Sequence, residues 1–319
     1  MSTKKTEEKK KRTNENSVVV IGTLAETGNL AVFKEDGDEV IKGKDFKKPD
    51  FVIESNGYSI GVRVFPTSKD KKPERFEALK KVMTYEVGTR VEVKGMISVG
   101  NPRLSANGNV YESVDITAWA ISSSNVPEED MAAGKVSGYI KGLKEEVDNE
   151  GEETGRGILD FWMYNEYNGD ESLKPFPVVV PKKLMEDAME YFDDEGNGYI
   201  EFNVTSQHKG GKKKKETEGG FGSRNKNIQT TSGYNVTQFE ISYGTFFDED
   251  NAEFENYYID EDKVNKLFRA HKQKVEEARN GENKSSDNSS KKGLGKKNTH
   301  IEEVDDDDDE NPFDDWFLN

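Results

Sequence analysis

The sequence predicts an all-β protein with a few short helices, arranged as two tandem copies of a five-stranded barrel. Runs rich in β-branched residues alternate apolar and polar side chains, which is typical of half-buried strands. The order strand, hairpin, helix, strand, strand occurs twice along the chain. Pro181 follows Pro73 by 108 residues, and Gly196 follows Gly88 by the same interval. A duplicated fold preserves the order of its elements while its loops vary, so two copies of one domain explain the pattern most economically.

The first copy is marked by three local signals. Gly22 interrupts a β-branched run, where a glycine often indicates a bulge or a barrel bend. Asn56-Gly57 between two alternating runs is a strong hairpin signal. Pro73 is suited to the first turn of a helix. The expected elements are a strand over 17–26, a hairpin over 51–65, a helix over 73–83 and strands over 90–99 and 110–121.

The second copy shows the same sequence of signals. Gly138 and Gly142 lie in its first β-branched run, as Gly22 does in the first copy. The expected elements are a strand over 135–144, a hairpin arm over 157–164, a helix over 181–192 and strands over 199–206 and 234–243.

Five short strands with a helix between the third and the fourth are the layout of the OB-fold, a small Greek-key barrel. We therefore expect two tandem OB-fold domains, then a helix capped by Asp260 and ended by Gly281, and finally a disordered acidic tail. The expected divisions are a disordered basic arm (1–16), OB-fold domain 1 (17–127), OB-fold domain 2 (128–250), a helical extension (251–280), a flexible linker (281–301) and the acidic tail (302–319).

Composition argues against several kinds of chemistry. The chain has 319 residues, no Cys and three His, which stand apart from one another in polar surroundings. Disulfides, thiolate catalysis, Cys-containing zinc sites and a Ser-His-Asp triad are therefore not expected. No phosphate-binding or nucleophile motif occurs, so we expect neither enzyme activity nor a cofactor. The apolar runs are too short to span a bilayer and no signal peptide is recognisable, which indicates a cytoplasmic protein.

One segment imitates a calcium-binding loop. Asp193, Glu195, Asn197 and Gly198 have the spacing with which an EF-hand loop begins. Val204 stands where such a loop needs its bidentate Glu. We expect a polar turn between a helix and a strand here, and no metal site.

Outward-facing aromatic and basic residues in the expected strands are of the kind that binds nucleic acid. Aromatic rings stack on bases, and Lys or Arg beside them neutralise phosphates. About half of these aromatics are expected to fill the barrels or to pack beneath helices instead, because large aromatics are mostly buried. The candidates are Tyr58, Arg63, Phe65, Lys94, Arg103, Tyr111 and Trp119 in the first copy, and Tyr139, Lys141, Trp162 and Tyr164 in the second.

A lysine-rich loop, residues 207–227, separates the last two strands of the second copy, where an OB-fold has one of its binding loops. Its lysines and its aromatic side chain suit a clamp on a nucleic-acid backbone. A surface loop with no binding role explains the same composition. The candidates here are Lys209, Lys212, Lys213, Lys214, Lys215, Phe221 and Arg224.

The last eighteen residues, EEVDDDDDENPFDDWFLN, combine a run of carboxylates with aromatics near the end. So many charges cannot pack into a core, because each buried unpaired charge costs several kcal/mol. A solubilising tail has no need of the aromatics, whereas a peptide that docks into a basic, apolar-lined pocket uses charge for steering and rings as anchors. The alternative is an acidic disordered end with no docking role, because charge runs are often only solvated tails. The candidate partner-binding residues are Asp305, Asp306, Asp307, Asp308, Asp309, Pro312, Phe313, Trp316 and Phe317.

With two OB-like copies, a lysine-rich link and this tail, the chain resembles single-stranded-DNA-binding proteins, most of all the tandem OB-fold type of large bacteriophages. Bacterial members of that class end in acidic residues followed by Pro-Phe, and Asp305 to Phe313 is similar. Here six residues follow Phe313, so a pocket that reads a terminal carboxylate is not implied. The Cys and His zinc site of one phage relative is absent as well.

The net charge of −17 is unevenly distributed, since residues 17–127 are neutral and most of the acidic excess lies towards the C-terminus. Local charge decides phosphate binding more than net charge does. The leading hypothesis is a non-enzymatic protein that coats single-stranded DNA and recruits replication, recombination or repair proteins through its tail. The alternative is an acidic OB-fold protein that binds proteins or mimics nucleic acid.

Overall fold

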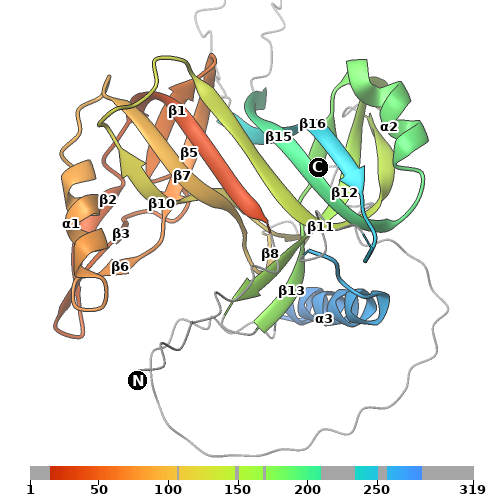
Figure 1. Cartoon of the computed structure of the whole chain (residues 1–319). Helices are drawn as coiled ribbons and strands as arrows, with labels where there is room; N and C mark the ends of the chain where they lie inside the picture. Colours follow the sequence, from red (N-terminus) through yellow and green to blue (C-terminus); the bar gives the residue numbers. More distant parts are fainter. Residues whose placement is uncertain are drawn as a thin grey trace, which may run out of the picture.

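The computed structural model describes residues 15–105, 108–147, 151–167, 170–209, 234–250 and 257–281. Two closed five-stranded barrels lie side by side in this part of the chain, with a helix beneath the second barrel (Figure 1). The fold class predicted from the sequence, an all-β protein of tandem OB-folds with short helices, is confirmed.

The first barrel closes through β1, which pairs with β4 on one side and with β7 on the other. β4 pairs antiparallel with β5, β5 pairs in parallel with β10, and β10 pairs antiparallel with β7. This circular order with one parallel pair is the OB topology. The five strands are β1 (Asn16–Glu26), β4 (Phe51–Ser55), β5 (Tyr58–Val64), β7 (Arg90–Val99) and β10 (Val114–Ser122).

Alternation along these strands fills the barrel interior. Ile60, Val62 and Val64 of β5 are all buried, while the residues between them face outward. Asn56 and Gly57 both have positive φ, 51° and 79°, as the hairpin between β4 and β5 requires.

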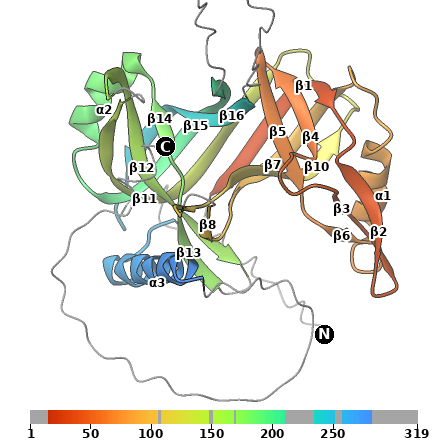
Figure 2. The same cartoon turned by 180° about the vertical axis from the view of Figure 1, so that it is seen from behind.

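The second barrel repeats the same circuit. β11 pairs with β12 and β15, β12 pairs with β14, β14 pairs in parallel with β16, and β16 pairs with β15. A further strand, β13, extends the free part of β12 below the barrel, which Figure 2 shows from behind. The strands are β11 (Met131–Val147), β12 (Glu153–Tyr167), β13 (Asp170–Pro175), β14 (Val178–Val180), β15 (Gly196–Lys209) and β16 (Tyr234–Phe246).

The two barrels are joined strand to strand. β1 pairs antiparallel with β11, from Asn16 opposite Val136 to Ile21 opposite Met131. The first strands of the two copies therefore form one continuous sheet, seen at the centre of Figure 1. This pairing was not expected from the sequence.

Gly22 and Gly138 have the same structural role in the first strands of the two barrels, β1 and β11. A Cβ on Gly22 would lie 2.2 Å from the carbonyl oxygen of Glu54 on β4, and a Cβ on Gly138 would lie 2.0 Å from that of Trp162 on β12. In each barrel the first and second strands approach so closely at this glycine that no side chain fits between them. The barrel bend expected at Gly22 stays a prediction, while the close approach of β4 explains why a glycine is needed there.

A small three-stranded sheet outside the first barrel was not predicted from the sequence. Asp36 and Gly37, both with positive φ, join its first two strands in a tight hairpin. The three strands are β2 (Leu30–Glu35), β3 (Asp38–Gly43) and β6 (Thr67–Ser68).

The strand expected over 110–121 is wrong in its first part. The chain forms a separate two-stranded hairpin, β8 (Arg103–Leu104) with β9 (Val110–Tyr111), and joins the barrel only at Val114. Glu112 interrupts the alternation because its carboxylate is buried against the C-terminal helix rather than turned towards solvent.

The helices follow the expected positions. α1 (Pro73–Val82) buries Phe76, Leu79 and Val82 against the first barrel. A 3-10 turn, η1 (Lys182–Leu184), leads into the short α2 (Met185–Tyr191). α3 (Glu261–Arg279) is capped by Asp260, whose carboxylate accepts a hydrogen bond from the Lys263 backbone N–H at 2.9 Å. None of the helices in the described ranges is long and apolar enough to span a bilayer.

The segment that imitates a calcium loop has a structural role. Asn197 lies at the start of β15, and its buried amide accepts from the Ile259 N–H at 3.0 Å and donates to the Ile259 carbonyl at 2.9 Å. It thereby fixes the chain just before α3. No group of acidic or His side chains within the described ranges is arranged to hold a metal ion.

Candidate nucleic-acid interface

Two exposed aromatic rings lie on the outward side of the parallel pair β5 and β10. Phe65 directly follows Val64, and Trp119 directly follows Ala118, which is the register partner of Val64. Phe65 is 37% exposed and Trp119 is 53% exposed. The sheet register shifts between Ala118 and Ala120, so Trp119 is the residue that bulges out of the ladder.

Two cations flank these rings. The guanidinium carbon of Arg75, on α1, lies 5.5 Å from the centroid of the Phe65 ring, and its Nη2 donates to the Ala118 carbonyl at 3.1 Å. Burial lowers the pKa of Arg75, although an Arg stays protonated in any ordinary buffer. Lys94 of β7 pairs with Ala120 beside the bulge, and its ammonium lies 3.4 Å from the Glu92 carboxylate. We call Phe65, Arg75, Lys94 and Trp119 the barrel-1 surface.

Arg63 is placed beside this surface but is already engaged. Its Nε donates to Asp115 at 2.7 Å and its Nη1 donates to the Lys48 carbonyl at 2.9 Å. The guanidinium therefore ties β5, β10 and the loop before β4 together. Arg63 therefore has a structural role, and its use as a phosphate ligand stays a prediction.

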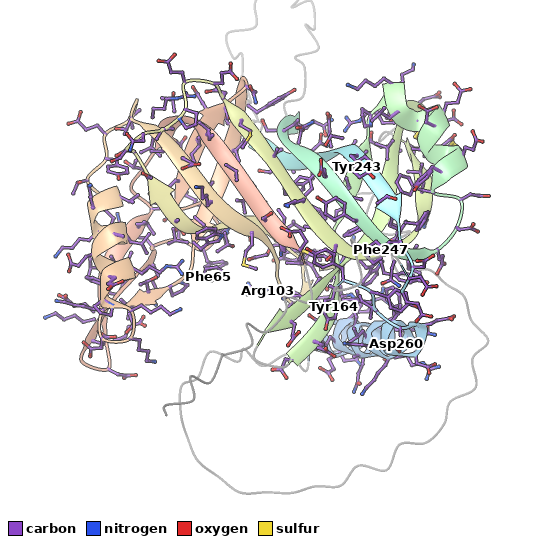
Figure 3. All side chains as sticks on the ribbon, viewed as in Figure 1. Phe65, Arg103, Tyr164, Tyr243, Phe247 and Asp260 are labelled. Atoms are coloured by element: carbon purple, nitrogen blue, oxygen red, sulfur yellow. The ribbon has the colours of Figure 1, made fainter. Side chains whose placement is uncertain are left out.

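The other exposed candidates of the first copy lie apart from the barrel-1 surface. Tyr58 begins β5 at the opposite end of that strand from Phe65 and is 38% exposed. Arg103 and Tyr111 are register partners in the β8–β9 hairpin, and Tyr111 is 42% exposed. In Figure 3 the Arg103 label lies between the labels of Phe65 and Tyr164.

The aromatic candidates of the second copy are covered by α3. Trp162 is 4% exposed and Tyr164 is 2% exposed, and both pack with Leu173, Ile259, Val264 and Leu267. Figure 3 labels Tyr164 next to α3. In this arrangement neither ring presents a face to a base, so both belong to the fraction expected to be structural.

Phe268 of α3 lies at the centre of the contact between α3 and the second barrel. Its ring meets Trp162 edge-on at 4.7 Å between centroids and Tyr139 at 5.8 Å, and the Lys141 ammonium lies 5.0 Å from its centroid. Tyr139 and Lys141 therefore also contact α3. The indole N–H of Trp162 donates to the Asp160 carboxylate at 2.8 Å.

A buried polar group, formed by Glu112, His271 and Lys174, lies at the other end of the contact between α3 and the barrels. Nε2 of His271 lies 3.3 Å from a Glu112 carboxylate oxygen, and neither Glu112 oxygen has a hydrogen bond with another described residue. Burial raises the pKa of Glu112 to about 7 and lowers the pKa of His271 to about 4. Nearby, the buried ammonium of Lys174 on β13 donates to Gly100 and Asn101, and burial lowers its pKa. The group links both barrels to α3.

Several predicted residues lie outside the described residues. The backbone of Lys209 is described at the end of β15, where it pairs with Tyr234. The remaining loop and tail candidates are Lys212, Lys213, Lys214, Lys215, Phe221, Arg224, Asp305, Asp306, Asp307, Asp308, Asp309, Pro312, Phe313, Trp316 and Phe317.

Two residues of the candidate interface were not predicted from the sequence. Arg75 lies on the predicted helix, but nothing in the sequence indicates that this helix places it over Phe65. Phe46 is 72% exposed in the loop before β4. Its position among Lys44, Lys47 and Lys48 was a usable signal.

Two closed barrels of OB topology with aromatic and basic side chains on the outer surface of the first define a tandem OB-fold protein. The family model named YorF matches residues 14–283. The chain belongs to the YorF family.

Solved structures similar to the chain include the wild-type single-stranded DNA binding protein from Thermus aquaticus and a deletion mutant of it. The wild-type structure has a TM-score of 0.45 and 12% sequence identity, and the match covers 75% of this chain and 96% of that chain. The mutant structure has the same TM-score and identity, and covers 74% and 96%. No curated protein sequence matches the chain.

Proposed function

We propose that this protein binds single-stranded DNA with little sequence preference, without catalysing a reaction. The observation that supports it most is the pair of exposed rings, Phe65 and Trp119, beside Arg75 on the outer side of an OB barrel. Aromatic stacking suits single strands because every base has a π-face, and it gives little sequence preference. Arg75 and Lys94 add cations for the phosphates.

The binding surface belongs mainly to the first barrel. Residues 17–127, which contain this barrel, are neutral overall, so a few well-placed cations can dominate the local field. The aromatic candidates Trp162 and Tyr164 of the second barrel are packed against α3 and are not part of the proposed surface. The lysine-rich loop, with Lys212 to Lys215, Phe221 and Arg224, is the contribution we assign to the second copy.

The tail is the second part of the proposed function. Asp305 to Asp309 and the aromatics Phe313, Trp316 and Phe317 recruit proteins of DNA replication, recombination or repair. The linker over 281–301 gives the tail reach. Without DNA, the carboxylates compete for the cationic surface. Removing residues 302–319 should therefore leave DNA affinity unchanged or raise it, and should abolish partner binding. A loss of DNA affinity would count against this role.

The net charge of −17 favours one alternative, an acidic OB-fold protein that binds proteins or mimics nucleic acid. A gel-shift titration with oligo-dT at low and at moderate salt separates the two. We expect retardation at micromolar protein or below, weakening steeply with salt as counterion release requires. No retardation at micromolar protein would favour the alternative.

A further inference from the structure

We infer that Phe46 is a base-stacking residue that extends the barrel-1 surface beyond Phe65 and Trp119. The inference rests on the proposed function, because the ligand it assigns is a base of single-stranded DNA. Phe46 lies in the loop of residues 44–50 that joins β3 to β4, and its side chain is 72% exposed. Among the large apolar side chains of the described ranges, none is more exposed.

The loop that carries Phe46 is held rigidly by Asn29. The Asn29 side chain accepts from the Asp45 N–H at 3.0 Å, and its amide donates to the carbonyls of Asp45 and Lys48 at 2.9 and 3.1 Å. The backbone carbonyl of Asn29 accepts from the Lys44 N–H at 2.6 Å. A ring presented by so fixed a turn loses little conformational entropy when a ligand stacks on it.

The same loop is fixed to β5 of the barrel-1 surface. Arg63, which precedes Phe65 by two residues, donates to the Lys48 carbonyl at 2.9 Å. Asp50, buried at the end of the loop, accepts from the Val64 N–H at 2.8 Å. Pro49 covers Gly61, where an added Cβ would meet it at 3.1 Å. Phe46 is therefore built into the outer side of the barrel that carries Phe65, with Arg63 as the bridge.

The charges around Phe46 match a nucleotide. Lys44, Lys47 and Lys48 are exposed in the loop, and the Lys47 ammonium lies 6.0 Å from the centroid of the Phe46 ring. Asp45 turns its carboxylate inward to the Lys47 backbone N–H at 2.9 Å. An exposed ring among cations suits a base with its flanking phosphates. The inferred path of the strand runs from Phe65 and Trp119 past Arg63 to Phe46.

The test compares Phe46→Ala with Val87→Ala in the full-length chain. Val87 is an apolar side chain of similar exposure, 65%, in the turn after α1. Binding is measured by fluorescence anisotropy with labelled oligo-dT and with an abasic oligonucleotide of equal length. We expect Phe46→Ala to weaken oligo-dT binding about 5- to 100-fold, the range for one stacked base. Binding to the abasic strand, and Val87→Ala on either strand, should change less than about twofold.

Three outcomes would overturn the inference. If wild-type protein binds oligo-dT and Phe46→Ala binds it as well as Val87→Ala does, Phe46 has no stacking role while the proposed function stands. If Phe46→Ala weakens the abasic strand as much as oligo-dT, the residue acts through the loop and not through a base. If wild-type protein binds neither strand, the inference fails together with the proposed function. Equal melting temperatures of both variants would show that the loop is intact.

Discussion

At the scale of single residues, exposure separates the side chains that serve the fold from those free to serve a ligand. Trp119 and Trp162 look alike in the sequence, since each lies in a run of residues typical of a strand. The structure leaves Trp119 53% exposed at a bulge and buries Trp162 to 4% under α3. Alternation predicts that a side chain leaves the barrel, but it cannot tell whether another element covers that side.

Trp119→Ala should therefore weaken oligo-dT binding about 5- to 100-fold, as expected for the loss of one stacking ring. Its free energy of unfolding should change by less than about 1 kcal/mol, because the ring is more than half exposed. Tyr243→Ala is the matched control, since Tyr243 is 52% exposed on β16 of the second barrel. Equal affinity losses in an anisotropy titration of both variants would refute a specific role for Trp119.

Gly138 gives a prediction about the fold itself. A Cβ there would lie 2.0 Å from the backbone carbonyl of Trp162, so strands β11 and β12 must separate to admit it. We expect Gly138→Ala to lower the free energy of unfolding by about 2–3 kcal/mol in urea denaturation. Gly196→Ala is the control, because its Cβ would meet only the Phe246 ring, at 3.2 Å. A loss for Gly196→Ala as large as that for Gly138→Ala would contradict the close-approach explanation.

At the scale of elements, α3 shows how far sequence patterns reach. Its cap at Asp260, its apolar positions and its end at Gly281 were all predictable, and Gly281 has the positive φ of a helix terminator. Its partner was not fully predictable, because the face it covers combines β11, β12 and β13 with the β8–β9 hairpin of the other barrel. Such a composite surface exists only after both barrels have formed.

The β2–β3 hairpin was missed for a different reason. Its Asp36-Gly37 turn is as strong a signal as Asn56-Gly57, and both pairs adopt positive φ. The strands around it are short and rich in charged residues, so their alternation is weak. The loop bearing Phe46 follows this hairpin, and the candidate site was incomplete for the same reason.

The buried pair Glu112 and His271 makes two opposite contributions to the pH dependence of folding stability. The pKa of Glu112 is raised to about 7, so the folded protein keeps a proton that the unfolded chain loses above pH 4.5, and stability falls as pH rises through this window. The pKa of His271 is lowered to about 4, so the unfolded chain binds a proton below pH 6.5 that the folded protein refuses. This contribution to stability is lost as pH falls. Lys174 and Lys274 oppose protonation of His271 and favour ionisation of Glu112.

The two contributions nearly cancel between pH 4.5 and 6.5, and single substitutions should separate them. Relative to wild type, Glu112→Gln should gain stability as pH rises from 4.5 to 7, whereas His271→Gln should lose stability as pH rises from 4 to 6.5. Each difference should reach at most about 3 kcal/mol. Urea denaturation at a series of pH values checks this. Differences of the same sign in both variants would mean that the pair is not buried as described.

At the scale of the whole molecule, the repeated order of elements was enough to predict two OB-folds. The continuous sheet through β1 and β11 was not predictable, because both strands look like ordinary first strands with no mark of a second partner. The junction fixes the barrels to each other, and α3 fixes them again from below (Figure 2). In the described part of the chain the two barrels and α3 are therefore joined into one unit, and the surface proposed to bind DNA lies on its first barrel.

Photo-cross-linking tests this claim most directly. The full-length protein is bound to an oligo-dT strand that carries a photoreactive base, irradiated, digested and mapped by mass spectrometry. We predict cross-links in the peptides that contain Phe65 and Trp119, lost when excess unlabelled oligo-dT competes. Cross-links confined to the second barrel, or none at a protein concentration that retards the strand, would contradict the assignment of DNA binding to the barrel-1 surface.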